Sequence, residues 1–568
     1  MLKNFSSEFL KNAAGFGIVF LLLILSVWKV SSGLEEQMDI RFYDESYYLT
    51  RGFFHPVSSW IADYSPLYSL WYKLEGLLFS DPVALYYANY RFWTFAFGLI
   101  IVFLLRLSGI RWENAAIWGI LATASQLALP LWPKAGHLAL LGTAAGIGGI
   151  QRWKDCPVSA LSWVTGIGLL LSFCRPEFLS AAMGAGLILP VVILWKKKYP
   201  QLGSIIPFIL GMVAVSIWGF PAGQSGRGMV AFGQHFVHNW RNISGQTQTD
   251  FMLDWVNWRP IVAQHFGKAA NPVEAMLANP ADMLLHLWFN FRYLIYNSLI
   301  YFSETIFPVR IFGLSPLYGL VFLIVSAEWL SGFKAGEGLL AKIRKKSWLH
   351  WLPWFFLALP SLLAGFLFQP RPHYILPLMA IFVFLAGRYF ALVPVKINAK
   401  QRTVLLALAL PLSFFLLPDT QAFFLLDKSN ADNSENNFPD AESHFSTVTC
   451  TSLERMQLVA SLRKYPFHQG FRIFDASTGA SEYLGQRLVQ CGKTGFEMNY
   501  DALADLEKFL DSAEVDGVFL HKTIHYDHFF TQNSFWQKLR SRPDGLGWKK
   551  VAIGSAGDSL ILRKKIRF

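Results

Sequence analysis

Long apolar runs separated by short polar turns dominate the first three quarters of the chain. A membrane-spanning helix needs about 20 mostly apolar residues. On that criterion we expect eleven spans, at residues 12–31, 83–105, 114–131, 135–150, 157–174, 178–195, 202–220, 311–330, 348–368, 375–393 and 403–418. The apolar stretch 283–307 is a twelfth span or a re-entrant helix, and its Arg292, Glu304 and His286 indicate partial burial against protein. The pattern predicts a polytopic α-helical membrane protein.

The pattern changes at residues 427–437, which are almost entirely polar. Beyond them, strand-like runs at 471–474, 517–520, 551–554 and 559–562 alternate with helical patterns such as 500–513. We therefore expect a membrane domain at 1–426, a linker at 427–440 and a soluble α/β domain at 441–568.

The composition agrees with this division. Of the 568 residues 53% are hydrophobic and only 15% are charged, and the mean hydropathy is +0.34. A soluble chain carries about 25% charged residues, so a soluble cytoplasmic protein is excluded. The net charge of +12 is spread between apolar runs, which excludes the profile of a nucleic-acid-binding protein.

The positive charges fall at alternate turns, which predicts the topology. Cytoplasmic loops are enriched in Lys and Arg. The basic positions that alternate in this way are Lys3 and Lys11, Arg106 and Arg111, Arg152 and Lys154, Lys196 to Lys198, Lys342 to Lys346, and Lys396 to Arg402. The N-terminus is therefore predicted to be cytoplasmic, and the long loops 31–82 and 221–310 and the C-terminal domain are predicted to lie outside.

Two of the four cysteines, Cys450 and Cys491, lie in the outer tail. Disulfides persist outside the cytoplasm, so we expect these two to form a bridge. Cys156 and Cys174 lie at opposite ends of one predicted helix and cannot meet.

The densest polar signal follows the first span directly, where Asp39, Asp44 and Glu45 lie among tyrosines. From Asp44 onward the pattern is that of a short amphipathic helix in the membrane interface. A carboxylate at the edge of a low-dielectric region has a raised proton affinity, which suits a general base. The alternative is a hydrated acidic loop that merely stays out of the cytoplasm.

The motif Asp44-Glu-Ser-Tyr-Tyr48, placed straight after the first span, resembles that of the GT-C superfamily of polyprenyl-phosphate-sugar glycosyltransferases. Protein O-mannosyltransferases and lipid A aminoarabinose transferases belong to this superfamily. Tyr64-Ser-Pro-Leu-Tyr68, Arg91 at the start of a span and Arg371-Pro-His-Tyr-Ile-Leu-Pro377 are similar to further elements of the family. In architecture the resemblance covers roughly residues 10–420.

The resemblance implies a GT-C-like fold and a reaction on the outer face of a bacterial inner membrane. Asp44 matches the catalytic aspartate, which deprotonates an acceptor as it attacks the anomeric carbon with inversion. Glu45 would hold the acceptor or tune Asp44. Other residues expected to contact substrate are Asp39, Tyr47, Tyr64, His137 and Glu177.

The leaving polyprenyl phosphate gains negative charge in the transition state, and fixed cations stabilise that charge. The cations predicted at outer helix ends are Arg91, Lys134, Arg175, Arg371 and His373. The alternative for any one of them is a side chain that reaches the lipid headgroups.

No cofactor is expected. Many relatives carry an acidic residue in the second outer loop, whereas here residues 132–137 contain no carboxylate, and no ligand spacing supports a divalent metal. The chain has no glycine-rich phosphate loop either, so the donor is expected to be lipid-linked.

Two other functions compete with transfer of a monosaccharide to a glycolipid, polysaccharide or protein. A transporter or flippase of lipid-linked sugars would carry paired charges at mid-bilayer, whereas the charges here lie at outer helix ends. A polysaccharide polymerase or ligase that uses a diphosphate-linked glycan would also place arginines outside. The position of the Asp44 motif favours the monosaccharide transferase.

Overall fold

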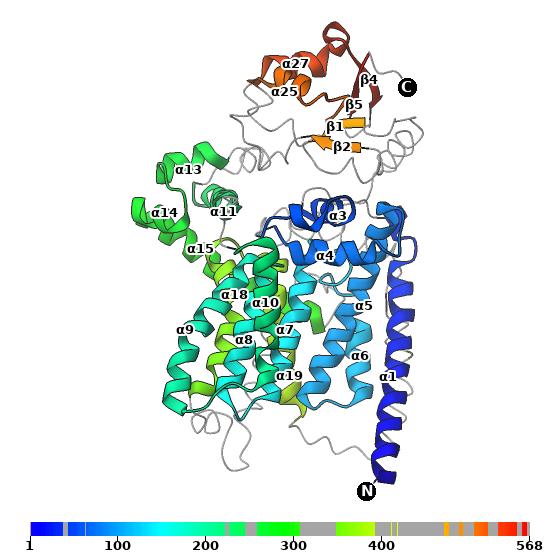
Figure 1. Cartoon of the computed structure of the whole chain (residues 1–568), viewed down its shortest axis with the longest axis vertical. Coiled ribbons are helices and arrows are strands. Elements are labelled where there is room, and N and C mark those ends of the chain that lie inside the picture. Colours follow the sequence, from blue (N-terminus) through cyan, green and yellow to red (C-terminus); the bar gives the residue numbers. More distant parts are fainter. Residues whose placement is uncertain are drawn as a thin grey trace. The chain divides into compact units, whose positions relative to one another are not determined.

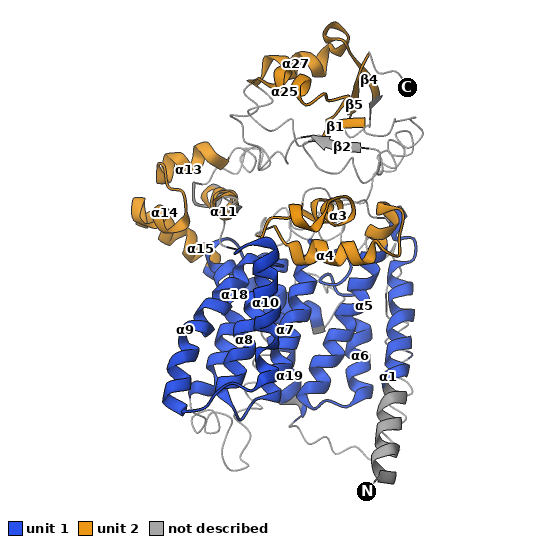
Figure 2. Cartoon of the chain, viewed as in Figure 1, with its two compact units in different colours: residues 1–37, 88–221, 291–448 blue, residues 38–87, 222–290, 449–568 orange. Residues whose placement is uncertain are grey.

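The computed structural model describes residues 2–37, 44–62, 64–221, 227–244, 258–306, 348–391, 411, 417, 471–475, 488–491, 505–520, 532–553 and 559–564. The chain divides into two compact units (Figure 2). Unit 1 comprises residues 1–37, 88–221 and 291–448, and unit 2 comprises residues 38–87, 222–290 and 449–568.

Unit 1 is a helix bundle (Figure 1). Its described elements are α1 (Leu2–Ser31), α2 (Leu34–Gln37), most of α5 (Pro82–Ser108), α6 (Trp112–Ala122), α7 (Ala135–Arg152), α8 (Pro157–Ser172), η2 (Pro176–Phe178), α9 (Leu179–Lys196), α10 (Leu202–Trp218), the second part of α15 (Pro280–Ile306), η3 (Trp348–His350), α18 (Leu352–Leu367) and α19 (Pro372–Ala391). Helix α8 packs against α7, α9, α10 and α18.

Small residues allow this packing. A Cβ added to Gly166 of α8 would lie 2.3 Å from the backbone nitrogen of Phe208 in α10. Backbones that approach so closely are typical of helices that associate in a membrane, where glycine allows tight van der Waals contact.

The apolar surface of the bundle fits a lipid environment. Among the described residues, two helices are long and apolar enough to cross a membrane, Pro82–Ser108 and Pro176–Lys196, and five apolar helices are shorter. Leu187 of α9 is 73% exposed and Leu202 of α10 is 80% exposed. Large apolar patches are unusual on the surface of soluble monomers, so this surface supports a membrane location.

The described helices occupy the predicted positions, with two main differences. Helix α1 begins at Leu2, ten residues before the predicted start. The helix predicted at 114–131 ends at Ala122 and is followed by turns. Of the other spans, 311–330 lies outside the described residues, and so does 403–418 except for positions 411 and 417.

Residues 283–306 of the ambiguous stretch lie in one continuous helix, α15. His286 and Glu304 are buried, as predicted. Arg292 is exposed, so the stretch is partly buried, as predicted.

Unit 2 contains two groups of described helices and a sheet. The first group is α3 (Asp44–Phe54), η1 (Val57–Ser59), α4 (Pro66–Glu75) and the start of α5. The second is α11 (Arg227–Ser244), α13 (Trp258–Phe266), α14 (Pro272–Ala278) and the start of α15. Helix α3 packs on α4, and α11 packs on α13.

The C-terminal tail forms a five-stranded sheet in the order β2-β1-β3-β5-β4. The strands are β1 (Phe471–Asp475), β2 (Leu488–Cys491), β3 (Gly517–Leu520), β4 (Trp548–Ile553) and β5 (Ser559–Arg563). Strands β2, β1 and β3 are parallel, whereas β5 and β4 are antiparallel to their neighbours. Helices α25 (Leu506–Ser512) and α27 (Ser534–Ser541) and the turn η6 (Pro543–Leu546) complete the described part of the tail.

The four strands predicted in the tail are confirmed, whereas β2 was not predicted. The predicted linker 427–440 and the Cys450–Cys491 bridge lie outside the described residues, since Cys450 is not among them. Cys156 and Cys174 flank the two ends of α8 and are not bonded to each other, as predicted.

Candidate active site

Glu45 in the first turn of α3 is fully buried and joins α3 to α4. The hydroxyls of Tyr68 and Tyr72 each donate a 2.6 Å hydrogen bond to its Oε1. The two tyrosines are four residues apart on α4 and therefore lie on one face of that helix. Hydrogen bonds to a carboxylate are among the stronger ones in proteins, so this cluster fixes the start of α3.

The far end of α3 is held by Arg51, which the sequence analysis did not single out. Its Nε donates a 2.9 Å hydrogen bond to Ser69 Oγ, and its Nη2 donates to the carbonyl of Tyr64. The guanidinium lies 5.1 Å from the ring centroid of Tyr47. The spacing of six residues between Glu45 and Arg51 is a weak sequence signal for this pair of contacts, because the residues of α4 that they bind cannot be identified from the spacing.

Asp44 precedes Glu45 at the first residue of α3 and is only half-buried. Successive helical residues point about 100° apart, so the two neighbouring carboxylates face different surroundings. The positive end of the helix favours a negative charge in the first turn. Of the predicted acidic cluster, Asp39 lies outside the described residues.

A third carboxyl group, that of Glu75 at the end of α4, has altered proton affinity. Burial, followed by the charge of Glu45, raises its pKa to about 8. Burial and the same carboxylate raise the pKa of Tyr72 well above its usual value. At neutral pH, Glu75 is thus mostly a neutral acid, and the Tyr72 hydroxyl remains a donor.

Three segments that carry predicted cations, from distant parts of the sequence, meet within unit 1. The thiol of Cys174 donates a 3.2 Å hydrogen bond to the carbonyl of Ala135. A Cβ on Gly136 would lie 3.3 Å from the Cβ of His373. The guanidinium of Arg175 lies 4.5 Å from the ring centroid of Tyr374. The segments 132–137, 174–177 and 369–374 therefore meet.

Arg175 and Glu177 form a nearly buried ion pair in this cluster. Arg175 Nε donates a 2.8 Å hydrogen bond to Glu177 Oε1, and the side chains are 7% and 13% exposed. Tyr374, which the sequence analysis did not single out, covers the guanidinium face. The pair and the ring together fix the orientation of Arg175.

Arg371 and His373 flank the beginning of α19 and remain half-exposed. Arg371 Nε donates a 3.3 Å hydrogen bond to the Gln369 side chain. The rings of His373 and Tyr374 are 4.4 Å apart. A cation at the positive end of a long helix is a suitable place for an anion such as a phosphate.

Arg91 forms an ion pair with Glu35 of α2 at 2.7 Å. Burial alone would raise the pKa of Glu35, but the hydrogen bond and the charge of Arg91 lower it below its usual value. Arg91 is therefore already partly neutralised by a carboxylate.

Lys134 and His137 are fully buried beneath the segment that follows Ala122. The Lys134 ammonium donates to the carbonyls of Ala128 and Leu129, and His137 Nε2 is 2.8 Å from the carbonyl of Leu127. In a continuous helix these backbone carbonyls would accept hydrogen bonds from the helix itself, and here the side chains of Lys134 and His137 donate to them instead. The apolar segment from Thr123 to Leu131 can therefore leave the helix without burying unsatisfied carbonyls.

A buried polar network that the sequence analysis did not predict joins α11 to α15. The Asn239 side-chain amide is 2.9 Å from His286 Nδ1 and donates a 2.8 Å hydrogen bond to Asn290 Oδ1. Asn290 Nδ2 is 3.1 Å from His286 Nε2. Histidine and asparagine at four-residue spacing on an apolar helix is the sequence signal that would have suggested it.

No group of three or more His, Cys, Asp or Glu side chains in the described ranges is arranged to hold a metal ion.

No protein-family model matches the sequence, and no curated protein matches it. Among solved structures, the chain is similar to ArnT from Cupriavidus metallidurans bound to undecaprenyl phosphate, at 13% identity and a TM-score of 0.36, over 97% of this chain and 98% of that one. It is also similar to the oligosaccharyltransferase from Archaeoglobus fulgidus, at 11% identity and a TM-score of 0.36, over 89% of this chain and 69% of that one.

A second structure of the archaeal enzyme, in complex with an inhibitory peptide and a dolichol-phosphate, gives 11% identity and a TM-score of 0.35, over 90% of this chain and 69% of that one.

Proposed function

We propose that the protein is an inverting glycosyltransferase that moves a monosaccharide from a polyprenyl-phosphate carrier to an acceptor on the outer face of the membrane. The observation that carries this proposal is that two adjacent carboxylates have different environments. Glu45 is buried and fixes α3 through two tyrosines, whereas Asp44 is half-buried at the start of the same helix. A general base needs this kind of rigid support together with access to substrate.

In the proposed reaction the Asp44 carboxylate takes the proton from the acceptor. The acceptor then forms a bond to the anomeric carbon while the bond from that carbon to the phosphate oxygen breaks. The polyprenyl phosphate leaves with an increased negative charge. No cofactor enters this scheme.

The cluster of cations in unit 1 is the proposed site for that phosphate. Arg371 and His373 are half-exposed at the start of α19, and Arg175 is held in place by Glu177 and Tyr374. Such preorganised positive groups stabilise charge that develops in a transition state. Arg91, which is paired with Glu35, adds positive charge to the proposed phosphate site. Lys134 and His137 act indirectly, by holding the turns at 123–131.

The proposed setting is the inner membrane of a bacterium, with the N-terminus in the cytoplasm and the C-terminal domain in the periplasm. The acceptor is a glycolipid, a polysaccharide or a protein, and the partners do not include nucleic acid.

The direct test is Asp44→Asn in the full-length protein, assayed with a polyprenyl-phosphate-linked monosaccharide and candidate acceptors. Product formation should fall by about 10²-fold or more, with unchanged thermal unfolding and donor binding. Asp81→Asn is the matched control, because Asp81 is an exposed carboxylate that caps the start of α5. Turnover by Asp44→Asn at the rate of the control would remove Asp44 from the mechanism, and donor translocation without product would favour a transporter.

A further inference from the structure

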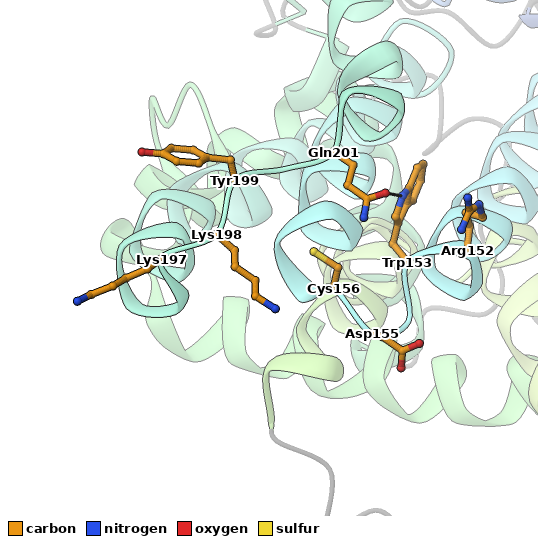
Figure 3. Close-up of a pocket in the computed structure, with 8 residues that line it drawn as sticks. All are labelled: Arg152, Trp153, Asp155, Cys156, Lys197, Lys198, Tyr199 and Gln201. Carbon is orange, nitrogen blue, oxygen red and sulfur yellow. Dashed lines mark hydrogen bonds between the residues drawn. The ribbon is translucent and has the colours of Figure 1, made fainter.

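A cavity of about 510 Å³ opens between the turn from α7 to α8 and the turn from α9 to α10 (Figure 3). It is lined by Arg152, Trp153, Asp155, Cys156, Lys197, Lys198, Tyr199 and Gln201. Helix α7 carries Gly136 of the cation cluster at its start and Arg152 at its end. At 1.5 Å per residue the two ends are roughly 25 Å apart, so the cavity is separate from the place where the segments 132–137, 174–177 and 369–374 meet.

The two turns are tied to each other by hydrogen bonds. Trp153 Nε1 donates a 3.0 Å hydrogen bond to Gln201 Oε1, which Figure 3 shows as a dashed line. The backbone nitrogen of Gln201 donates a 3.0 Å bond to Ser159 Oγ in α8. The cavity walls are thus preformed, which lowers the entropic cost of binding a ligand.

The charge of the cavity favours an anion. Three of its lining side chains are basic and one is acidic, and Lys198 extends toward the turn that carries Cys156 (Figure 3). The N-cap residues of α8 and α10, Cys156 and Gln201, also line it. The negative ends of α7 and α9 lie at the same two turns, with Arg152 as the last residue of α7 and Lys197 as the C-cap of α9, so the positive charge of the cavity comes from its basic side chains.

The rim of the cavity is apolar and exposed. Leu194 of α9 is 77% exposed, and Leu202 follows the lining residue Gln201 in α10. The exposed side of α9 continues through Val191 and Leu187, and that of α10 continues through Ile206 and Ile209. Trp195 and Tyr199 are aromatic and exposed beside the lysines, a combination that is typical of the membrane–water interface.

We propose that this cavity binds the phosphate headgroup of an anionic phospholipid, with its acyl chains lying along the exposed faces of α9 and α10. The site belongs to the leaflet that the positive-inside rule makes cytoplasmic. A phosphate is the chemistry that the basic lining side chains select, and the apolar rim selects a lipid over free phosphate. The proposal does not depend on the transferase activity.

The test is native mass spectrometry of the full-length protein in detergent, titrated with phosphatidylglycerol, with phosphatidylcholine or with inorganic phosphate. Phosphatidylglycerol should bind preferentially, and Lys197→Gln/Lys198→Gln should weaken it roughly 30-fold. The matched control, Lys345→Gln/Lys346→Gln, removes the same charge from another segment predicted to be cytoplasmic. Lys197→Arg/Lys198→Arg should retain binding.

Three results would overturn the proposal. Unchanged lipid binding by Lys197→Gln/Lys198→Gln would show that the two lysines do not bind the lipid. Equal weakening of lipid binding in the control variant would show that the loss of affinity comes from the net charge of the protein and not from this cavity. Displacement of the lipid by inorganic phosphate at equal concentration would show a site for soluble phosphate. Thermal unfolding of each variant in the same detergent separates a lost site from a lost fold.

Discussion

The hydroxyl of Tyr72 donates a 2.6 Å hydrogen bond to the carboxylate of Glu45, 27 residues earlier in the chain. Both side chains are fully buried. A buried carboxylate is costly unless its oxygens are satisfied, and Tyr72 and Tyr68 both donate to Oε1. The contact therefore holds the helix that presents Asp44 in one position.

Replacing Glu45 by alanine should destabilise the protein by roughly 2–4 kcal/mol, because two buried hydroxyls lose their acceptor. Denaturant unfolding in detergent measures the loss. Combining Glu45→Leu with Tyr68→Phe and Tyr72→Phe removes every polar member of the cluster and should recover most of the stability. If this triple variant is as unstable as Glu45→Ala, packing rather than unsatisfied polar groups is the cause.

Gly52→Ala should separate α3 from α4. A Cβ at this position would lie 2.4 Å from the carbonyl oxygen of Ser69 and 2.7 Å from the Cβ of Tyr72. The obstacle is backbone, which cannot rotate away, so we expect lower thermal stability and lower turnover together. Gly228→Ala is the control, because a Cβ there meets no atom within 4 Å. Equal effects from the two substitutions would contradict a specific close approach in α3.

Glu75→Gln should make the protein less sensitive to alkaline pH. The folded-state pKa is about 8, against 4.5 for the ordinary carboxyl group. Between these values the folded state holds more protons than the unfolded state, so the free energy of unfolding falls as the pH rises. Glutamine cannot ionise. Thermal unfolding should therefore show similar stability of variant and wild type at pH 4.5, and a more stable variant at pH 8.5. A difference that does not change with pH would disprove the raised pKa.

Arg371→Gln and Arg175→Gln should both lower turnover, but only Arg175→Gln should also lower the stability of the fold. Losing one charged contact to the donor phosphate lowers kcat/KM by roughly 10- to 100-fold, and for Arg371→Gln the thermal stability should remain unchanged. Arg175→Gln should also destabilise the fold by about 3 kcal/mol or more, since Glu177 is left as an unpaired, nearly buried charge.

The double variant Arg175→Gln/Glu177→Gln separates these effects. It should restore stability without restoring turnover. Recovery of both would make Arg175 a purely structural residue.

The sequence predicted the elements whose signal is local. The amphipathic pattern after Asp44 predicted α3, and alternation in the tail predicted four of the five described strands. The partners of Glu45 could not be predicted, because Tyr68 and Tyr72 are 23 and 27 residues away.

The sequence analysis did not predict that α6 ends at Ala122, and the reason is different. Hydropathy continues through Leu131, whereas the backbone is released from the helix by hydrogen bonds from Lys134 and His137. The same two residues were expected at the substrate, because a lone cation at a helix end has the same sequence signal whether it binds a ligand or a carbonyl.

The two anchors of α3 set a limit on changes of chain length. Glu45 and Arg51 both contact the α4 side of the helix and are six residues apart. One inserted residue between them would rotate one anchor by about 100° relative to the other, so only one could stay in place. Insertions and deletions in this segment should therefore be far less tolerated than substitutions of its exposed side chains.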